Sequence, residues 1–299
     1  MRLPRTVVNR LKSSAAKIYS ETCEAMLVKL VGGNVLHVDE TPIILEGVQE
    51  YAWVFCNVNR IVFWRTETRE GHFLNELLQD YNGVLVSDFY PAYDSIQCPK
   101  QKCLVHLMRD LNNDLLKEPF NEELKAQAQE FGDLLKRIVE TIDRFGLRAR
   151  YLRKHGQDVA RFFRRLSNQV YRTETAARYQ IRFEKNRQTL FTFIEHDDVP
   201  WNNNTAEHAI KALAVLRKAI GGISTQGGMD DYLVLLSICE TCKCHGVRFL
   251  DFLRSGEKDV QAFAENSRGR RRRSWLLRSS GGEKRFKRLG WQSEAIGHP

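Results

Sequence analysis

The sequence predicts an α/β protein in which a mixed five-stranded sheet is flanked by helices. Three segments rich in β-branched and aromatic residues follow one another at 35–45, 50–58 and 60–69, a composition that is typical of strands. Two further apolar segments lie at 83–93 and 100–106. Three consecutive strands, followed by an alternation of helices and strands, indicate a mixed sheet with helices packed on it.

Helices are expected before, between and after these strands. Apolar residues recur at helical spacing over 4–31, 71–81, 204–220 and 229–254. Between 107 and 199 the pattern is mostly helical and strongly charged. This long helical stretch separates the predicted strands from the last predicted helices.

We therefore expect five regions along the 299-residue chain, whose hydrophobic content of 42% supports a real core. They are an N-terminal helix leading into the core (1–34), the first part of the core (35–106), a basic helical insertion (107–199), C-terminal helices that complete the core (200–255) and a basic, disordered tail (256–299).

The net charge of +9 is unevenly distributed. Segment 144–188 has thirteen Lys and Arg residues against three acids, and segment 267–299 has ten against two. Two basic zones on a mildly acidic body favour a polyanionic partner, with nucleic acid as the first candidate. The alternative is a solvated basic face together with a disordered tail.

Composition also points to a cellular compartment. No apolar run approaches the roughly 20 residues of a membrane helix, and the basic start has no apolar core of a secretory signal. The seven cysteines show no framework-like spacing, which favours a reducing interior. We expect a cytoplasmic protein without a membrane partner.

Two carboxylates lie in the middle of the first predicted strand, "VLHVDETPIIL". Because side chains alternate along a strand, Asp39 shares a face with His37 and Thr41, while Glu40 points to the other face. We expect Glu40 to form structural hydrogen bonds or to point to solvent near Pro42.

Asp88 ends the apolar run of "GVLVSDFYPAY". If its strand neighbours the strand of Asp39, the two carboxylates converge, and a divalent cation with oxygen ligands would relieve their repulsion. Two such ions about 3.5–4 Å apart assist phosphoryl transfer. The alternative is that each aspartate only ends a strand or caps a helix.

A third carboxylate is expected from "PWNNNTAEHAIKALAVLRK" at 200–218. Asn204 or Thr205 would cap this helix, and Glu207 would reach the metal while Lys211 contacts a phosphate backbone. The alternative is a solvated helix face with one Glu–Lys pair.

Five blocks in this order, "HVDETPI", "SDFYPAY", "CLVHLMRDL", "PWNNNTAEHAIK" and "SICETCKCHGVRFLDFL", resemble the insertion sequence 66 family of transposases. The resemblance covers about residues 8–255. It implies an RNase H-like fold with a helical insertion before the last catalytic helix, and an Asp-Asp-Glu triad at Asp39, Asp88 and Glu207. These are the carboxylates that the strand and helix patterns single out.

The resemblance implies metal-dependent cleavage of DNA and strand transfer, with two Mg²⁺ or Mn²⁺ ions bound by the triad. The partners would be double-stranded DNA at transposon ends and target sites, and further copies of the chain on that DNA. Bacterial relatives imply a cytoplasmic, nucleoid-associated protein. Residues expected to contact DNA are Lys211, Arg217, Asn203, Asn204 and His208.

Some positions depart from the family pattern. Asn202 stands where Asp is usual, and His208 where Arg follows the glutamate. The chain also starts at the helix before the first catalytic strand, so we expect the upstream DNA-binding region of the family to be lacking. Two alternatives therefore stay open: an RNase H-like nuclease without joining activity, and an inactive or repurposed DNA-binding remnant.

Overall fold

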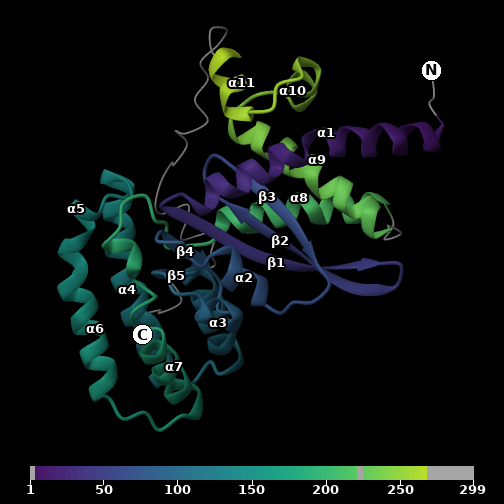
Figure 1. Ribbon diagram of the computed structural model, residues 1–299. Helices are drawn as coiled ribbons and strands as arrows, with labels where there is room; N and C mark the ends of the chain where they lie inside the picture. The colour runs from purple at the N-terminus through teal and green to yellow at the C-terminus, as the bar shows by residue number, and fades with distance from the viewer. Residues whose placement is uncertain (1–3, 221–224, 268–299) are drawn as a thin grey trace. The chain divides into compact units, whose positions relative to one another are not determined.

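The computed structural model describes residues 4–220 and 225–267, and within helix α8 the side chains only as far as residue 215. These residues form two compact units. One unit contains the described residues up to 98 and from 203 to 267, and the other contains residues 99–202. Figure 1 shows the elements along the chain.

The strands form one sheet in the order β3-β2-β1-β4-β5. Strand β2 is antiparallel to both β1 and β3, whereas β4 is parallel to β1. The predicted mixed five-stranded sheet of an α/β protein is therefore confirmed. The strands are β1 (Val35–Leu45), β2 (Val48–Cys56), β3 (Ile61–Thr66), β4 (Val84–Ser87) and β5 (Lys100–Lys102).

Two tight turns connect the first three strands. Between β1 and β2 the chain turns at Glu46 and Gly47, both with positive φ (49° and 86°), as two-residue hairpin turns require. Between β2 and β3 the side chain of Asn57 accepts hydrogen bonds from the backbone N–H groups of Asn59 and Arg60. Asn57 thus stabilises this turn through its side chain, as asparagine commonly does in tight turns.

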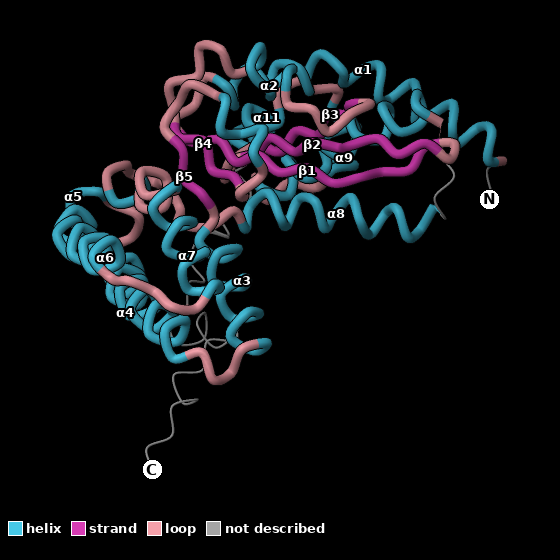
Figure 2. Tube along the Cα trace, turned by 90° about the horizontal axis from the view of Figure 1, so that it is seen from below, coloured by secondary structure: helices cyan, strands magenta, loops and turns pink. Residues whose placement is uncertain are grey.

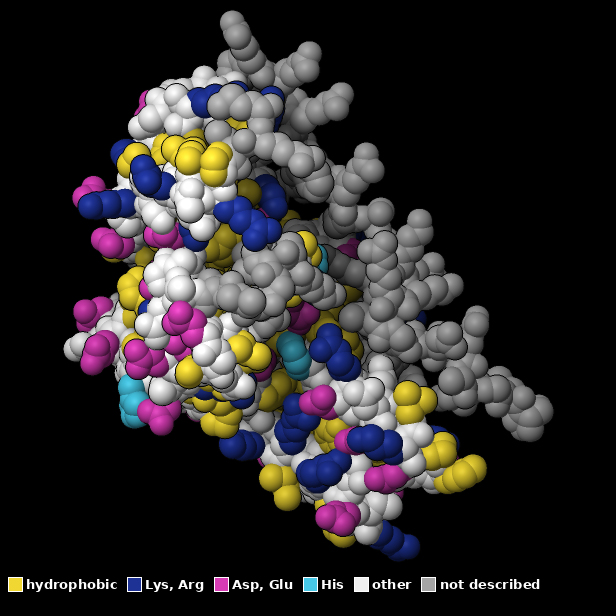
Figure 3. Space-filling view, turned by 90° about the vertical axis from the view of Figure 1, so that its right-hand side faces the viewer, with side chains coloured by type: hydrophobic (Ala, Val, Ile, Leu, Met, Phe, Trp, Pro, Cys, Tyr) yellow, Lys and Arg dark blue, Asp and Glu magenta, His cyan; other side chains and the backbone are white. Residues whose placement is uncertain are grey.

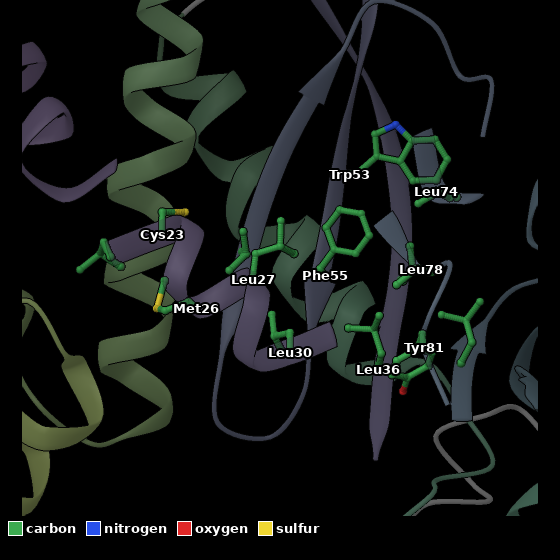
Figure 4. Close-up of a cluster of buried hydrophobic side chains, with 14 of the residues drawn as sticks. Cys23, Met26, Leu27, Leu30, Leu36, Trp53, Phe55, Leu74, Leu78 and Tyr81 are labelled. Atoms are coloured by element: carbon green, nitrogen blue, oxygen red, sulfur yellow. The ribbon is translucent and has the colours of Figure 1, made fainter. Parts of the chain in front are cut away.

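Helices cover both faces of the β1–β3 part of the sheet. Figure 2 shows the sheet with α1 (Arg5–Val31) and α2 (His72–Leu77) on one side and α8 (Asn204–Ile220) on the other. On the α1 side, Trp53 and Phe55 of β2 pack among apolar residues of both helices (Figure 4). On the other side, α8 buries Ala206, Ala209 and Leu213 against the sheet.

The open edge of β3 is closed by α9 (Gln226–Cys244). The hydroxyl of Ser237 accepts the N–H of Phe63, and the hydroxyl of Thr241 both accepts the N–H and donates to the carbonyl of Ile61. An edge strand otherwise presents unpaired backbone groups. These two hydroxyls bond backbone groups of β3 that a sixth strand would otherwise have to pair.

The chain continues through α10 (Phe249–Ser255) and α11 (Val260–Ser267). Helix α11 lies within the segment 256–299 that we expected to be disordered. It is ordered because Val260, with Phe263 beside it, packs into the same core as α1. Residues 268–299 of that segment lie outside the described residues.

The second unit is mostly helical. Six phenylalanines from its helices and loops contact one another in its core (Phe131, Phe162, Phe163, Phe183, Phe191 and Phe193). Its helices are α3 (Leu104–Lys117), α4 (Glu122–Phe145), α5 (Ala149–Leu152), α6 (Gly156–Asn168) and α7 (Glu174–Lys185).

Several predicted elements end earlier than expected. The strand predicted over 100–106 ends at Lys102, and Leu104 begins α3, because 104, 107, 108 and 111 are buried at helical spacing. The helix predicted over 71–81 ends at Leu77. Segment 83–93, by contrast, opens as a short strand and breaks near Pro91 as predicted, with β4 ending at Ser87 and a 3-10 helix at Pro91–Ser95.

The helix predicted over 229–254 is divided into α9 and α10. The interruption contains Gly246 at φ 69°, a left-handed backbone conformation that ends helices. No helix in the described part of the chain is long and apolar enough to cross a membrane.

Candidate active site

Asp39 and Asp88 lie on neighbouring parallel strands. The β1–β4 register pairs Val35 with Val84 and His37 with Val86. Continuing this register by two residues places Asp39 beside Asp88, which directly follows the last residue of β4. The structure therefore meets the condition under which the two carboxylates were predicted to converge.

Asp39 points to the face of the sheet that α8 covers. It pairs across the sheet with Val54, and Val54 belongs to the core cluster that contains Ala206 and Ala209 of α8. The adjacent Glu40 pairs with Trp53, which belongs to the core on the opposite face. The predicted separation of the two acids by strand alternation is confirmed.

Asn203 fixes the start of α8 to the middle of β1. Its side-chain N–H donates to the carbonyl of Val38 at 2.9 Å, and its side-chain oxygen lies 2.9 Å from Nδ1 of His37. Its carbonyl accepts the N–H of Glu207 at 3.1 Å. Glu207 is thus in the first turn of a helix that is attached to the strand directly before Asp39.

This role differs from the DNA contact that we predicted for Asn203. The residue is completely buried, so we remove it from the DNA-contacting set and assign it to the positioning of α8. The helix begins at Asn204, so Asn204 and Thr205 lie inside the helix instead of capping it.

The carboxylates are close enough to affect one another's ionisation. Burial raises the pKa of Asp39 to about 7, and the negative charges of Glu40, Asp88 and Glu207 add to this shift. The backbone N–H of Glu40, which donates to Asp39 Oδ1 at 2.9 Å, opposes it in part. Asp39 is therefore held where ionisation is unfavourable without a compensating positive charge.

Both aspartates accept backbone hydrogen bonds. Asp88 Oδ1 accepts the N–H of Tyr90 at 2.8 Å. Within residues 4–220 and 225–267, neither Asp39 nor Asp88 forms a salt bridge with Lys, Arg or His. Burial lowers the pKa of His37 to about 4 against the effect of its bond to Asn203, so His37 is neutral at pH 7 and supplies no charge.

This set of residues fits a hard divalent cation. Carboxylates that lie close together and repel one another are stabilised by a metal ion, and oxygen donors suit Mg²⁺ or Mn²⁺ better than softer metals. Asp39, Asp88 and Glu207 are the residues that would hold such ions.

The other predicted DNA contacts lie on α8. His208 and Lys211 are exposed, and Asn204 is half-buried. Lys211 is one turn after Glu207 on the same side of the helix, as the sequence predicted. The side chain of Arg217 lies outside the described residues.

The residues that bind Glu40 were not predicted from the sequence. The Glu40 carboxylate accepts hydrogen bonds from Arg69 and from the hydroxyl of Tyr93, so its predicted structural hydrogen bonding is confirmed. Its partners come from distant segments, and only the aromatic residues after Asp88 in "SDFYPAY" gave a signal of them.

The fold and this group of carboxylates define an α/β protein with an acidic site suited to divalent cations. Residues 1–231 match the family model described as "Transposase IS66 family". The chain therefore belongs to the IS66 transposase family, as the motifs predicted. No curated protein matches the chain.

Membership gives the chain a general role. It is a transposase, an enzyme of the nucleotidyl-transfer type that acts on DNA, and it belongs to a family that uses divalent metal ions.

Proposed function

We propose that this transposase cleaves phosphodiester bonds at transposon ends and joins the freed 3′-hydroxyl to target DNA, with Asp39, Asp88 and Glu207 as its catalytic, metal-binding residues. The observation that carries the proposal is geometric: the β1–β4 register brings Asp39 beside Asp88, and Asn203 attaches the start of α8, which carries Glu207, to β1. The raised pKa of Asp39, whose causes include the charges of Asp88 and Glu207, agrees with this geometry. Two strands and one helix thus contribute one carboxylate each to a single acidic site.

The chain's own residues would act mainly by positioning. Bound Mg²⁺ would supply charge neutralisation for the attacking and leaving oxygens. Asn203 holds α8, and with it Glu207, against β1, and the backbone N–H of Tyr90 orients the Asp88 carboxylate. Preorganisation of this kind provides most of the catalysis in phosphoryl transfer.

DNA would be bound beside these carboxylates. Lys211 and His208 are exposed on α8, and we propose that they contact backbone phosphates, together with Asn204 and Arg217. The basic segment 144–188 of the second unit would add further phosphate contacts. Assembly of several copies on DNA, and a cytoplasmic, nucleoid-associated location, belong to the same proposal.

The test is Asp88→Ala, assayed for cleavage and joining of labelled DNA carrying the element's ends, in Mg²⁺ and in EDTA. We expect Mg²⁺-dependent cleavage by the wild type and none by the variant. Asp80→Ala is the matched control, because Asp80 is an exposed aspartate in the segment before β4. Unchanged cleavage by Asp88→Ala contradicts the triad assignment.

The same assay separates the two alternatives. Cleavage without joining by the wild type would identify a nuclease that lacks strand transfer. Absence of both cleavage and Mg²⁺ binding would identify an inactive, DNA-binding remnant. Joined products identify a transposase that carries out the full reaction.

A further inference from the structure

A second buried carboxylate lies on β1, next to the proposed site but on the other face of the sheet. The Glu40 side chain is only 2% exposed. Its Oε1 accepts hydrogen bonds from both Nε (2.9 Å) and Nη2 (2.6 Å) of Arg69, and its Oε2 accepts one from the hydroxyl of the fully buried Tyr93. The glutamate is therefore a fixed anchor for the guanidinium.

Tyr90 links this guanidinium to the turn that carries Asp88. The Arg69 Cζ lies 4.0 Å from the centroid of the Tyr90 ring, a cation–π distance. The Tyr90 hydroxyl donates to the carbonyl of Arg69 at 3.1 Å, while the Tyr90 backbone N–H donates to Asp88. Arg69 is thus held by its main chain and its side chain beside a proposed catalytic aspartate.

The charge of Asp88 also acts on Arg69. Burial lowers the pKa of Arg69, but hydrogen bonding to Glu40 and the charges of Glu40, Tyr90 and Asp88 outweigh burial and raise it. The guanidinium is therefore a permanent positive charge within electrostatic reach of the acidic site.

Arg65, four residues earlier, provides an internal comparison. It also pairs with a buried glutamate, Glu50, through Nη1, but its Nε and Nη2 are bound to Asp230. Its side chain is 17% exposed, against 46% for Arg69. Arg65 is thus shared by two carboxylates, whereas Arg69 has one.

The remaining donors of Arg69 are available to a ligand. Within the described part of the chain its Nη1 forms no hydrogen bond. On the face shown in Figure 3, Lys and Arg side chains lie among Asp and Glu side chains instead of forming one basic field. An arginine with free donors and a half-exposed side chain is therefore more informative about ligand binding than surface charge alone.

We infer that Arg69 binds a backbone phosphate of the DNA substrate near the turn that carries Asp88, and that Glu40, Tyr90 and Tyr93 hold it in position. The inference rests on the proposed function for the identity of the anion. A planar guanidinium matches two phosphate oxygens. Because its side chain is already ordered by Glu40 and Tyr90, little conformational entropy is lost on binding. Its charge also offsets the repulsion between the phosphate and the acidic site.

The test measures binding of a fluorescent DNA duplex by anisotropy in EDTA over a range of salt concentrations. We expect Arg69→Gln to bind about tenfold more weakly, as for the loss of a charged hydrogen bond. The slope of log affinity against log salt should fall by about one. Arg69→Lys should keep most of the slope but lose part of the affinity.

Two further variants separate phosphate binding from simple neutralisation of Glu40. Glu40→Gln combined with Arg69→Gln removes both charges and leaves no buried unpaired carboxylate, and we expect its DNA binding to remain weak. Glu50→Gln combined with Arg65→Gln is the matched control, and it should bind DNA as the wild type does. Thermal melts check that each variant is folded.

Three results overturn the inference. One is wild-type binding by the Glu40→Gln, Arg69→Gln variant, since Arg69 would then only neutralise Glu40. Another is an unchanged salt slope in Arg69→Gln. The third is equal weakening by the Arg65 control pair. All are measured without metal, so they are independent of catalysis: failure of the proposed function appears as absent Mg²⁺-dependent cleavage, whatever the salt slope.

Discussion

Two neighbouring carboxylates on strand β1, Asp39 and Glu40, have opposite environments on the two faces of the sheet. On one face, Glu40 accepts hydrogen bonds from Arg69 and Tyr93 and is neutralised by an arginine. On the other, Asp39 receives one backbone hydrogen bond, and burial together with nearby acids raises its pKa to about 7. One residue along the strand separates a satisfied charge from an unsatisfied one.

The difference shows what each carboxylate contributes. A buried charge with good partners is compatible with a purely structural role. A half-buried aspartate that is pushed toward protonation destabilises the metal-free fold, and such groups gather at functional sites. The contrast favours Asp39 as the ligand of an external cation, and it assigns Glu40 to the support of Arg69.

The largest expected effect compares the same chemical change on the two faces. Asp39→Asn should lower Mg²⁺-dependent cleavage by on the order of a thousandfold, as for the loss of one electrostatic group in a preorganised site. Glu40→Gln should lower it by about tenfold or less, because it acts only through Arg69. Single-turnover cleavage rates and Mn²⁺ binding measure both. Equal losses in the two variants would contradict the distinction between the faces.

The next effect concerns the connection between the Asp39 face and α8. Asn203→Ala removes the partners of His37 and of the Val38 carbonyl, two buried polar groups. We expect a loss of about 2–4 kcal/mol in the free energy of unfolding and metal binding weaker by about 10–100-fold. Chemical denaturation and Mn²⁺ titration provide the two measurements.

His208→Ala is the control for that experiment. His208 is exposed on α8, five residues after Asn203, so the free energy of unfolding should change by less than about 0.5 kcal/mol in this variant. If Asn203→Ala weakens neither stability nor metal binding, α8 is not held in place by this residue.

The unfavourable ionisation of Asp39 can also be tested by measuring stability as a function of pH. The pKa of Asp39 is raised in the folded state from 3.8 to about 7, so the folded protein binds this proton more tightly than the unfolded chain. Stability of the metal-free protein therefore falls as pH rises from about 4 to 7, and stays reduced above that. Asp39→Asn cannot ionise, so it should raise Tm by a few degrees at pH 8 and not at pH 4.

Mg²⁺ provides the control for the pH experiment. At pH 8 the ion should raise the Tm of the wild type, because it binds the folded state, and have much less effect on Asp39→Asn. A variant that melts below the wild type at pH 8 without metal would show that Asp39 is satisfied in a way that its hydrogen bonds do not reveal.

Strand alternation and apolar runs were enough to predict the strand and the helix that carry two of the candidate carboxylates. They gave the correct bounds of β1 and of α8, and they placed Asp39 and Glu40 on opposite faces. These features depend on local periodicity, which is visible in any single sequence. The pairing of Asp39 with Asp88 needed one further assumption, that the two strands are neighbours, and the sheet order satisfies it.

Other features could not be predicted because they depend on contacts between distant segments. Asn203 was predicted to contact DNA, yet it is buried against a strand that lies 165 positions away in the sequence. Arg69 and Tyr93 gave no periodic signal that would link them to Glu40. The strand predicted over 100–106 gives way to helix α3 at Leu104, because residues of this segment are buried at helical spacing, which determines the structure more strongly than a short apolar run.

The smallest expected effect lies on the Glu40 face. Tyr93→Phe removes the hydroxyl that donates to Glu40 while keeping the ring, which packs edge-on against Trp53 and Tyr90. We expect the free energy of unfolding to fall by about 1–2 kcal/mol, as for the loss of a buried hydrogen bond to a charged group, and the Mg²⁺ affinity to stay unchanged. Tyr90→Phe should lower the free energy of unfolding by less, because the Tyr90 hydroxyl that it removes donates to an exposed carbonyl. Denaturation and metal titration of both variants test this. If Tyr93→Phe weakens metal binding as strongly as Asn203→Ala does, the two faces of β1 are coupled and the supporting role of Glu40 extends to the metal site itself.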